Sequence, residues 1–174
     1  MRNVLTNSME TLLHIRMVIR NTEVPSWVYG VPAAFGEAKS GTLKADEWRS
    51  LTTIYLPLAL VILWGIDSNH PNQHSAEVLQ NHLDHTMRLV SAIQLALYRH
   101  TTSERAEKFA IHMKHYLDDL QVLHPDASRV CNQHMSLHLP MFLKLFGPAY
   151  SWWSFVFERL IGRLQRLPSN NTFG

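Results

Sequence analysis

The sequence is short of cysteine and of charge. Its single cysteine, Cys131, cannot form an internal disulfide, which excludes a small fold held together by disulfide bridges. Charged residues make up 17% of the 174 residues and hydrophobic residues 46%, which excludes a disordered chain, because such chains show the opposite balance. The formal net charge of +2 is too small to indicate nucleic acid or acidic lipid as a partner by itself. We therefore expect one globular domain with a hydrophobic core.

Long apolar runs are also missing. The N-terminus has no uninterrupted apolar stretch followed by a small-residue cleavage site, so we expect no secretory signal and a nuclear or cytoplasmic location. The most apolar run, residues 51–66, is shorter than the roughly 20 residues that cross a bilayer. It favours a buried central helix, kinked at Pro57, which lacks a backbone donor. A membrane-associated helix is the weaker alternative.

Strand signals are weak, whereas apolar residues recur at helical spacing between turn signals. Thr101 and Glu104 match a capping box at a helix start, and Gly147-Pro148 is typical of a helix end. The pattern predicts an all-α single domain of five or six helices, in which the C-terminal helix packs on the central one. The clearest of these predicted helices run over about 5–20, 43–64, 75–98, 102–123 and 149–166.

The predicted domain has two parts. Residues 1–42 should form an N-terminal helix followed by an irregular connection, because residues 21–42 contain two prolines and three glycines. Residues 43–174 should form the main helical part.

Eleven histidines are spread over the predicted segments, which favours surface and helix-face roles over a metal site. The pairs His82/His85 and His112/His115 are interpreted as solvated helix faces. A histidine-based metal-binding protein is the least favoured function of those considered.

Cys131 and His134 form a Cys-x-x-His unit, and His138 lies four residues further along the same expected helix face. Zinc prefers four ligands in two pairs, and no fourth ligand is in sight. The unit is therefore not interpreted as a zinc site.

The C-terminal segment combines aromatic, acidic and basic residues. Its aromatic residues are interpreted as core, with a shelf for unpaired bases as the alternative. Glu158 stands in the apolar run and needs a partner there, either an ion pair with a neighbouring arginine, solvent, or a metal ion. Arg159, Arg163 and Arg166 follow at helical spacing, and such a stripe can contact phosphates or simply face solvent.

The order of these features resembles the CACTA (En/Spm-like) transposases. The matching block contains His134-Met135-Ser136-Leu137-His138-Leu139, then Phe146-Gly147-Pro148, then the run from Phe155 to Arg166 that reads FVFERLIGRLQR. Residues 43–49, with Tyr55-Leu56-Pro57 and Leu63-Trp64-Gly65, are similar to the helical region that precedes it. The resemblance extends over about residues 25–174.

The resemblance implies a ribonuclease-H-like nuclease whose three carboxylates hold two Mg²⁺ or Mn²⁺ ions for phosphodiester transfer. It implies that Glu158 is the third carboxylate and that Cys131 and His134 form the element preceding it. The two strand-borne aspartates of the family pattern are missing, because all six aspartates lie in predicted helices or loops. We therefore expect a C-terminal transposase fragment that is inactive alone and holds no metal by itself.

The expected partners are DNA and the rest of a transposase, with no membrane. A non-enzymatic module that binds DNA or protein through Arg159, Arg163 and Arg166 is the main alternative.

Overall fold

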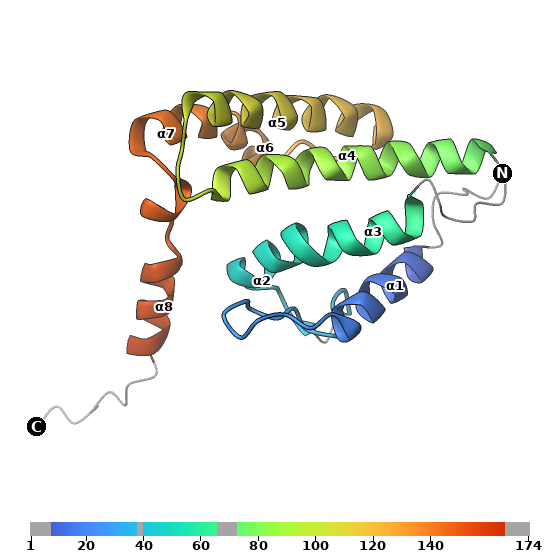
Figure 1. The fold of residues 1–174 in the computed structure, drawn as a ribbon, viewed down its shortest axis with the longest axis horizontal. Helices are drawn as coiled ribbons and strands as arrows, with labels where there is room; N and C mark the ends of the chain where they lie inside the picture. Colours follow the sequence, from blue (N-terminus) through green and yellow to red (C-terminus); the bar gives the residue numbers. More distant parts are fainter. Residues whose placement is uncertain (1–7, 38–39, 66–72, 166–174) are drawn as a thin grey trace, which may run out of the picture.

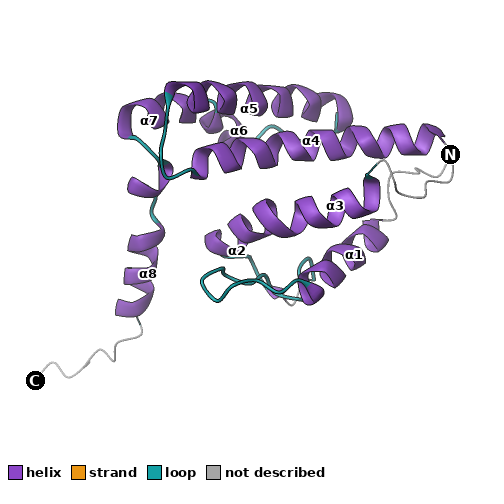
Figure 2. Cartoon of the chain, viewed as in Figure 1, coloured by secondary structure: helices purple, strands orange, loops and turns teal. Residues whose placement is uncertain are grey.

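The computed structural model describes residues 8–37, 40–65 and 73–165. All the regular structure in these ranges is helical (Figure 2), which confirms the predicted all-α single domain. The elements are, in chain order, α1 (Ser8–Asn21), α2 (Ala45–Ser50), η2 (Leu51–Tyr55), α3 (Leu56–Trp64), α4 (Gln73–Leu97), α5 (Ser103–Leu123), α6 (Cys131–Ser136), α7 (Leu139–Phe146), η3 (Ala149–Ser151) and α8 (Phe155–Leu164).

The first hydrophobic cluster lies between α1 and the segment formed by η2 and α3. Arg16 of α1 also fixes the irregular connection, because its Nε donates to the Phe35 carbonyl oxygen at 2.7 Å and its guanidinium pairs with Glu37 at 3.3 Å. The connection therefore packs on α1 rather than hanging free. The buried members of this cluster are Ile15, Val18, Ile19, Val31, Leu51, Tyr55 and Ala59.

The predicted central helix is interrupted where Pro57 disturbs its hydrogen bonding. Pro57 stands in the first turn of α3, and the five residues before α3 form the π-helical turn η2. The amide of Leu56 donates to the carbonyl of Leu51 across this wide turn. The kink predicted at Pro57 is thus taken up as a π turn, which is a known cause of bends in helices. In the described ranges, no helix has the length and apolarity to cross a membrane.

The second cluster joins the α4–α5 hairpin to α7. Figure 1 shows α4 lying between α5 and α3. Arg88 of α4 forms an ion pair with Asp119 of α5. The N-cap of α5 is Thr102, whose hydroxyl accepts from the Arg105 amide at 3.2 Å, so the predicted cap at Thr101 is wrong by one residue. The buried members of the cluster are Ala92, Ala106, Phe109, Met113 and Leu143.

The C-terminal segment does not pack as predicted. Gly147 ends α7 with a positive φ of 79°, and the chain then forms η3 and α8 instead of one helix from residue 149. Figure 1 shows α8 projecting away from the other helices, so the expectation that it packs on the central helix is wrong. The aromatic residues of this segment do not form a core either, because Tyr150, Trp152 and Phe157 are 43%, 37% and 66% exposed. The first part of the segment still packs on the body of the domain, because η3 contacts α4 and α7 and the Arg49 guanidinium lies 5.9 Å from the ring centre of Trp153. It is α8 that projects from the body.

Candidate functional site

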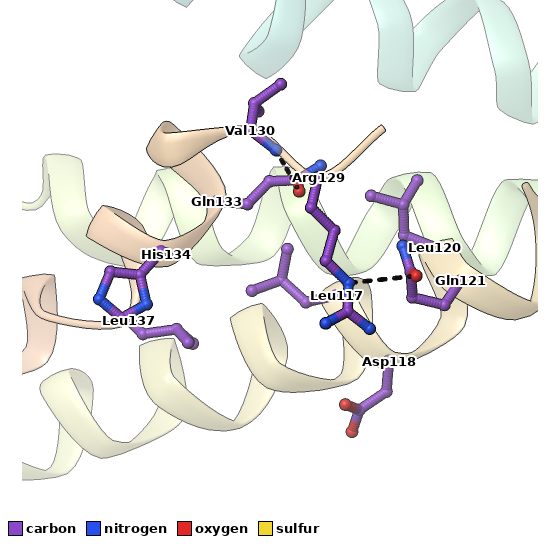
Figure 3. A pocket seen from close by; sticks show the side chains of 9 residues that line it. All are labelled: Leu117, Asp118, Leu120, Gln121, Arg129, Val130, Gln133, His134 and Leu137. Carbon is purple, nitrogen blue, oxygen red and sulfur yellow. Dashed lines mark hydrogen bonds between the residues drawn. The ribbon is translucent and has the colours of Figure 1, made fainter. Parts of the chain in front are cut away.

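A groove of about 460 Å³ lies between the C-terminal half of α5 and α6 (Figure 3). Its apolar lining comes from α5, from α6 and from the residues that flank α6. Val130 and Leu137 are 54% and 48% exposed, so the groove is open to solvent on the α6 side. The apolar lining residues are Leu117, Leu120, Val130 and Leu137.

The polar rim of the groove is fixed by local hydrogen bonds. Gln133, at the third position of α6, accepts from the Val130 amide at 3.1 Å and so satisfies one backbone donor ahead of the helix. Arg129 donates from Nε to the Gln121 side chain at 3.3 Å, which links the entry of α6 to α5. Asp118, on the same rim, pairs with Lys114 at 2.5 Å. The groove therefore combines apolar side chains with polar ones and carries charge of both signs at its edge.

The Cys-x-x-His unit lies beside this groove. Cys131 is exposed and begins α6, and His134 lines the groove. The prediction that His138 lies on the same helix is wrong, because α6 ends at Ser136 and His138 is the N-cap of α7. The two histidines still meet: their rings lie 5.0 Å apart and their Nε2 atoms 3.2 Å apart.

The described residues do not fit the two-metal site that the resemblance implies. Within the described ranges, no three His, Cys, Asp or Glu side chains are placed to hold one metal ion. Asp46, Asp118 and Asp119 are each paired with a basic side chain. Asp84 accepts a hydrogen bond from Gln80. We therefore derive no catalytic step from this chain.

Glu158 and the arginine stripe fall on α8 or beyond it. Glu158 and Arg159 lie within α8, Arg163 stands exposed in its last turn, and Arg166 lies outside the described residues. Among the described elements, α8 takes part in none of the larger helix–helix contacts. The structure therefore does not bring this helix to the Cys-x-x-His unit.

The exposed apolar face of α8 is a feature that sequence reasoning missed. Phe157, Leu160, Ile161 and Leu164 are 66%, 52%, 53% and 55% exposed. They are spaced i, i+3, i+4 and i+7, which places them on one face of the helix. The sequence pattern favoured a core helix here because nothing local distinguishes a buried apolar face from an unpartnered one.

A histidine cluster in the α4–α5 seam was also missed. His124, at the end of α5, has its ring 5.3 Å from that of His82 and 6.1 Å from that of His85. The expected solvated face is wrong for His85, which is 6% exposed and stacks on Tyr116 with ring centres 4.5 Å apart. The contacts come from residues about 40 positions apart, which a local helical pattern does not reveal.

Burial favours the neutral form of two members of this cluster, His82 and His85. Burial, and then the neighbouring His124, lower the pKa of His82. Burial is also the main cause that lowers the pKa of His85; His124, His82 and Arg88 lower it further, and Asp119 opposes them. The pKa of the Tyr116 hydroxyl is raised by burial. His82, His85 and Tyr116 are thus biased towards their neutral forms.

Comparisons of the chain with protein-family models, with curated proteins and with solved structures find no match. The class that the fold and the groove define is an all-helical domain with an open interhelical groove and a projecting amphipathic helix.

Proposed function

We propose that the chain is the C-terminal helical region of a CACTA-type DNA transposase and has no catalytic activity alone. The observation that carries the proposal is the ordered block of a Cys-x-x-His unit, a Gly-Pro break and a Phe-Glu-Arg run within residues 131–166. Support from the fold is that the first two steps coincide with element boundaries, since α6 begins at Cys131 and α7 ends just before Gly147, and that the third step lies within a single helix, α8.

In this proposal, the ancestral role is metal-dependent phosphodiester transfer during DNA transposition. Two metal ions need several carboxylates around them, and Glu158 is a single one. It would contribute to an Mg²⁺ or Mn²⁺ site only together with aspartates from another part of a transposase.

The absence of catalysis is tested by a nuclease assay. Purified chain is incubated with single- and double-stranded DNA in the presence of Mg²⁺ or Mn²⁺, and cleavage is measured on denaturing gels. We expect no cleavage above buffer, with or without the metal. Metal-dependent cleavage that disappears in Glu158→Ala would show that the chain is a nuclease, contrary to the proposal.

Contact with DNA through α8 is the part of the role that this chain can carry out. Arg163 is exposed on α8, and Arg159 precedes it by about one helical turn. Phosphate contacts of this kind release counterions, so the logarithm of the binding constant should fall linearly with the logarithm of the salt concentration. Arg166 continues the same spacing in the sequence.

The DNA test compares two double variants by fluorescence anisotropy over a salt series. Arg159→Ala/Arg163→Ala should weaken binding to any duplex and reduce the salt slope by about two, because each arginine removed takes one phosphate contact with it. Lys108→Ala/Lys114→Ala removes the same charge from the exposed face of α5 and should leave the slope unchanged. Equal effects of the two variants would mean that net charge, and not α8, governs the binding.

A protein-interaction module is the second candidate, and the exposed apolar stripe of α8 favours it. If the chain showed no salt-dependent binding to DNA but associated with a protein through this stripe, the protein-interaction role would replace the DNA-binding role.

A further inference from the structure

No described residue packs over the apolar stripe of α8, which consists of Phe157, Leu160, Ile161 and Leu164. More than half of each of these side chains is exposed. Large apolar surfaces gathered on one helix face usually mark a contact with another molecule. In the described part of the chain, α8 forms none of the larger contacts between helices.

The α5–α6 groove is lined by four apolar and five polar side chains, and no described segment of the chain fills it. Its volume of about 460 Å³ falls within the usual range of binding pockets, roughly 300–1,000 Å³. An apolar groove between two helices is the common receptor for an amphipathic helix, which inserts anchors at i, i+3, i+4 and i+7. The stripe of α8 has this spacing.

We propose that two copies of the chain associate by exchanging α8, so that the stripe of each copy lies in the α5–α6 groove of the other. Within one copy, α8 points away from the body of the domain that carries α5 and α6 (Figure 1). A second copy supplies both a helix for the groove and a groove for the helix. Such an exchange is self-complementary and closes as a symmetric dimer, without surfaces left to extend into a filament.

The area involved distinguishes reciprocal exchange from a single contact. One docked helix with four large apolar side chains buries on the order of 800 Å² over the two surfaces, which is the size of a crystal-packing contact. The reciprocal pair buries about 1,600 Å², the size of an ordinary stable interface. Exchange in both directions is therefore the arrangement that the available surface can sustain.

Charge at the edge of the groove is compatible with this arrangement. Asp118 stands on the rim with 59% of its side chain exposed and pairs with Lys114, whereas Arg129 makes another part of the rim positive. Arg163, which precedes the last residue of the stripe by one position, must therefore lie on the Asp118 side of the groove. Opposite charges at the rim of an interface guide its register and speed its formation more than they tighten it.

The first test measures self-association of the full chain by sedimentation equilibrium over a range of concentrations. We expect a dimer whose dissociation constant rises by about tenfold or more in Leu160→Asp and also in Val130→Asp, because each places a charge in the apolar contact. Both positions are exposed, so the changes should leave the fold intact, as circular dichroism will check. Val122→Asp is the matched control, because Val122 is 79% exposed on α5 and does not line the groove.

The second test uses Cys131, which is the only cysteine and begins α6 beside the groove. Ser154→Cys and Gln165→Cys place a second thiol at one or the other end of α8. With a short bismaleimide, one of these variants should form dimers linked between Cys131 and the new thiol. Adding Cys131→Ser should abolish the linking.

Several outcomes would overturn the proposal. One is a chain that remains monomeric at all concentrations. Another is a dimer linked through two α8 thiols when Cys131 is replaced, which would indicate pairing of the helices with each other. A third is a monomer that binds vesicles of phosphatidylserine and phosphatidylcholine and loses this binding in Leu160→Asp, since α8 would then be a membrane-surface helix. None of these readouts depends on DNA binding or cleavage, so the transposase proposal stands or fails separately.

Discussion

Replacing His85 by leucine should stabilise the protein. The His85 side chain is 6% exposed, and its Nδ1 is buried without a hydrogen-bond partner among the described residues. A buried polar atom without a partner costs about 1–3 kcal/mol. Leucine has a similar volume and no polar atom, but it loses the stacking on Tyr116, which is worth about 0.5–1.5 kcal/mol. His85→Leu should therefore raise the free energy of unfolding by roughly 1 kcal/mol at neutral pH.

The advantage of this variant should grow in acid. The pKa of His85 in the folded chain is lowered, chiefly by burial, so the unfolded chain takes up a proton at this site before the folded chain does. Stability contributed by the neutral form is therefore present above the unfolded-state pKa of about 6.5 and is lost as the pH falls towards the lowered folded-state pKa. His82 titrates in the same direction, so some acid sensitivity remains in the variant.

Urea denaturation followed by circular dichroism, at about pH 7.5 and about pH 5.5, measures both effects. His115→Leu serves as control, because His115 is exposed on α5 and its replacement should change stability by less than about 0.5 kcal/mol. If His85→Leu destabilised the chain at both pH values, the buried Nδ1 of His85 would not destabilise the native fold, contrary to this prediction.

Three further sets of substitutions test how the helices are capped and packed. Thr102→Ala should cost about 1 kcal/mol through loss of the α5 cap, whereas Thr101→Ala should cost little, as urea denaturation will measure. Gly147→Ala should lower the melting temperature, because φ is +79° there, whereas Gly162→Ala inside α8 should raise local helicity by circular dichroism and meets no neighbouring atom. Phe109→Ala should cost about 3–5 kcal/mol in urea denaturation, because Phe109 is 1% exposed and its removal leaves a cavity.

Sequence patterns correctly predicted the long helices and the all-α fold class. The predicted helix over 75–98 corresponds to α4 (Gln73–Leu97), and Gly147-Pro148 does end α7 as predicted. These predictions succeed because helical periodicity and the positive φ favoured by glycine are local properties of the chain. The cap of α5 was misplaced by one residue because Thr101 and Thr102 are both good N-cap residues.

Sequence patterns did not predict the contacts between residues that are far apart along the chain. The groove depends on how the residues around Arg129 turn the chain back along α5, and the cluster of His85 with His124 depends on how α4 and α5 pack together. The exposure of Phe157 depends on the direction in which the chain leaves Gly147. An apolar stripe looks the same in sequence whether its own chain or another molecule covers it.

The wide turn η2 ahead of Pro57 constrains how this region can change in length. A π turn holds one more residue than an α turn, so the extra residue is taken up within η2 instead of shifting every later side chain by about 100° around the helix. Deleting one residue of η2 should therefore restore an uninterrupted α-helix and leave Ala59 packed towards α1, whereas deleting a residue within α3 should rotate the side chains that follow it. The turn thus illustrates how a helix can absorb a one-residue insertion without giving up the side chains on either side of it.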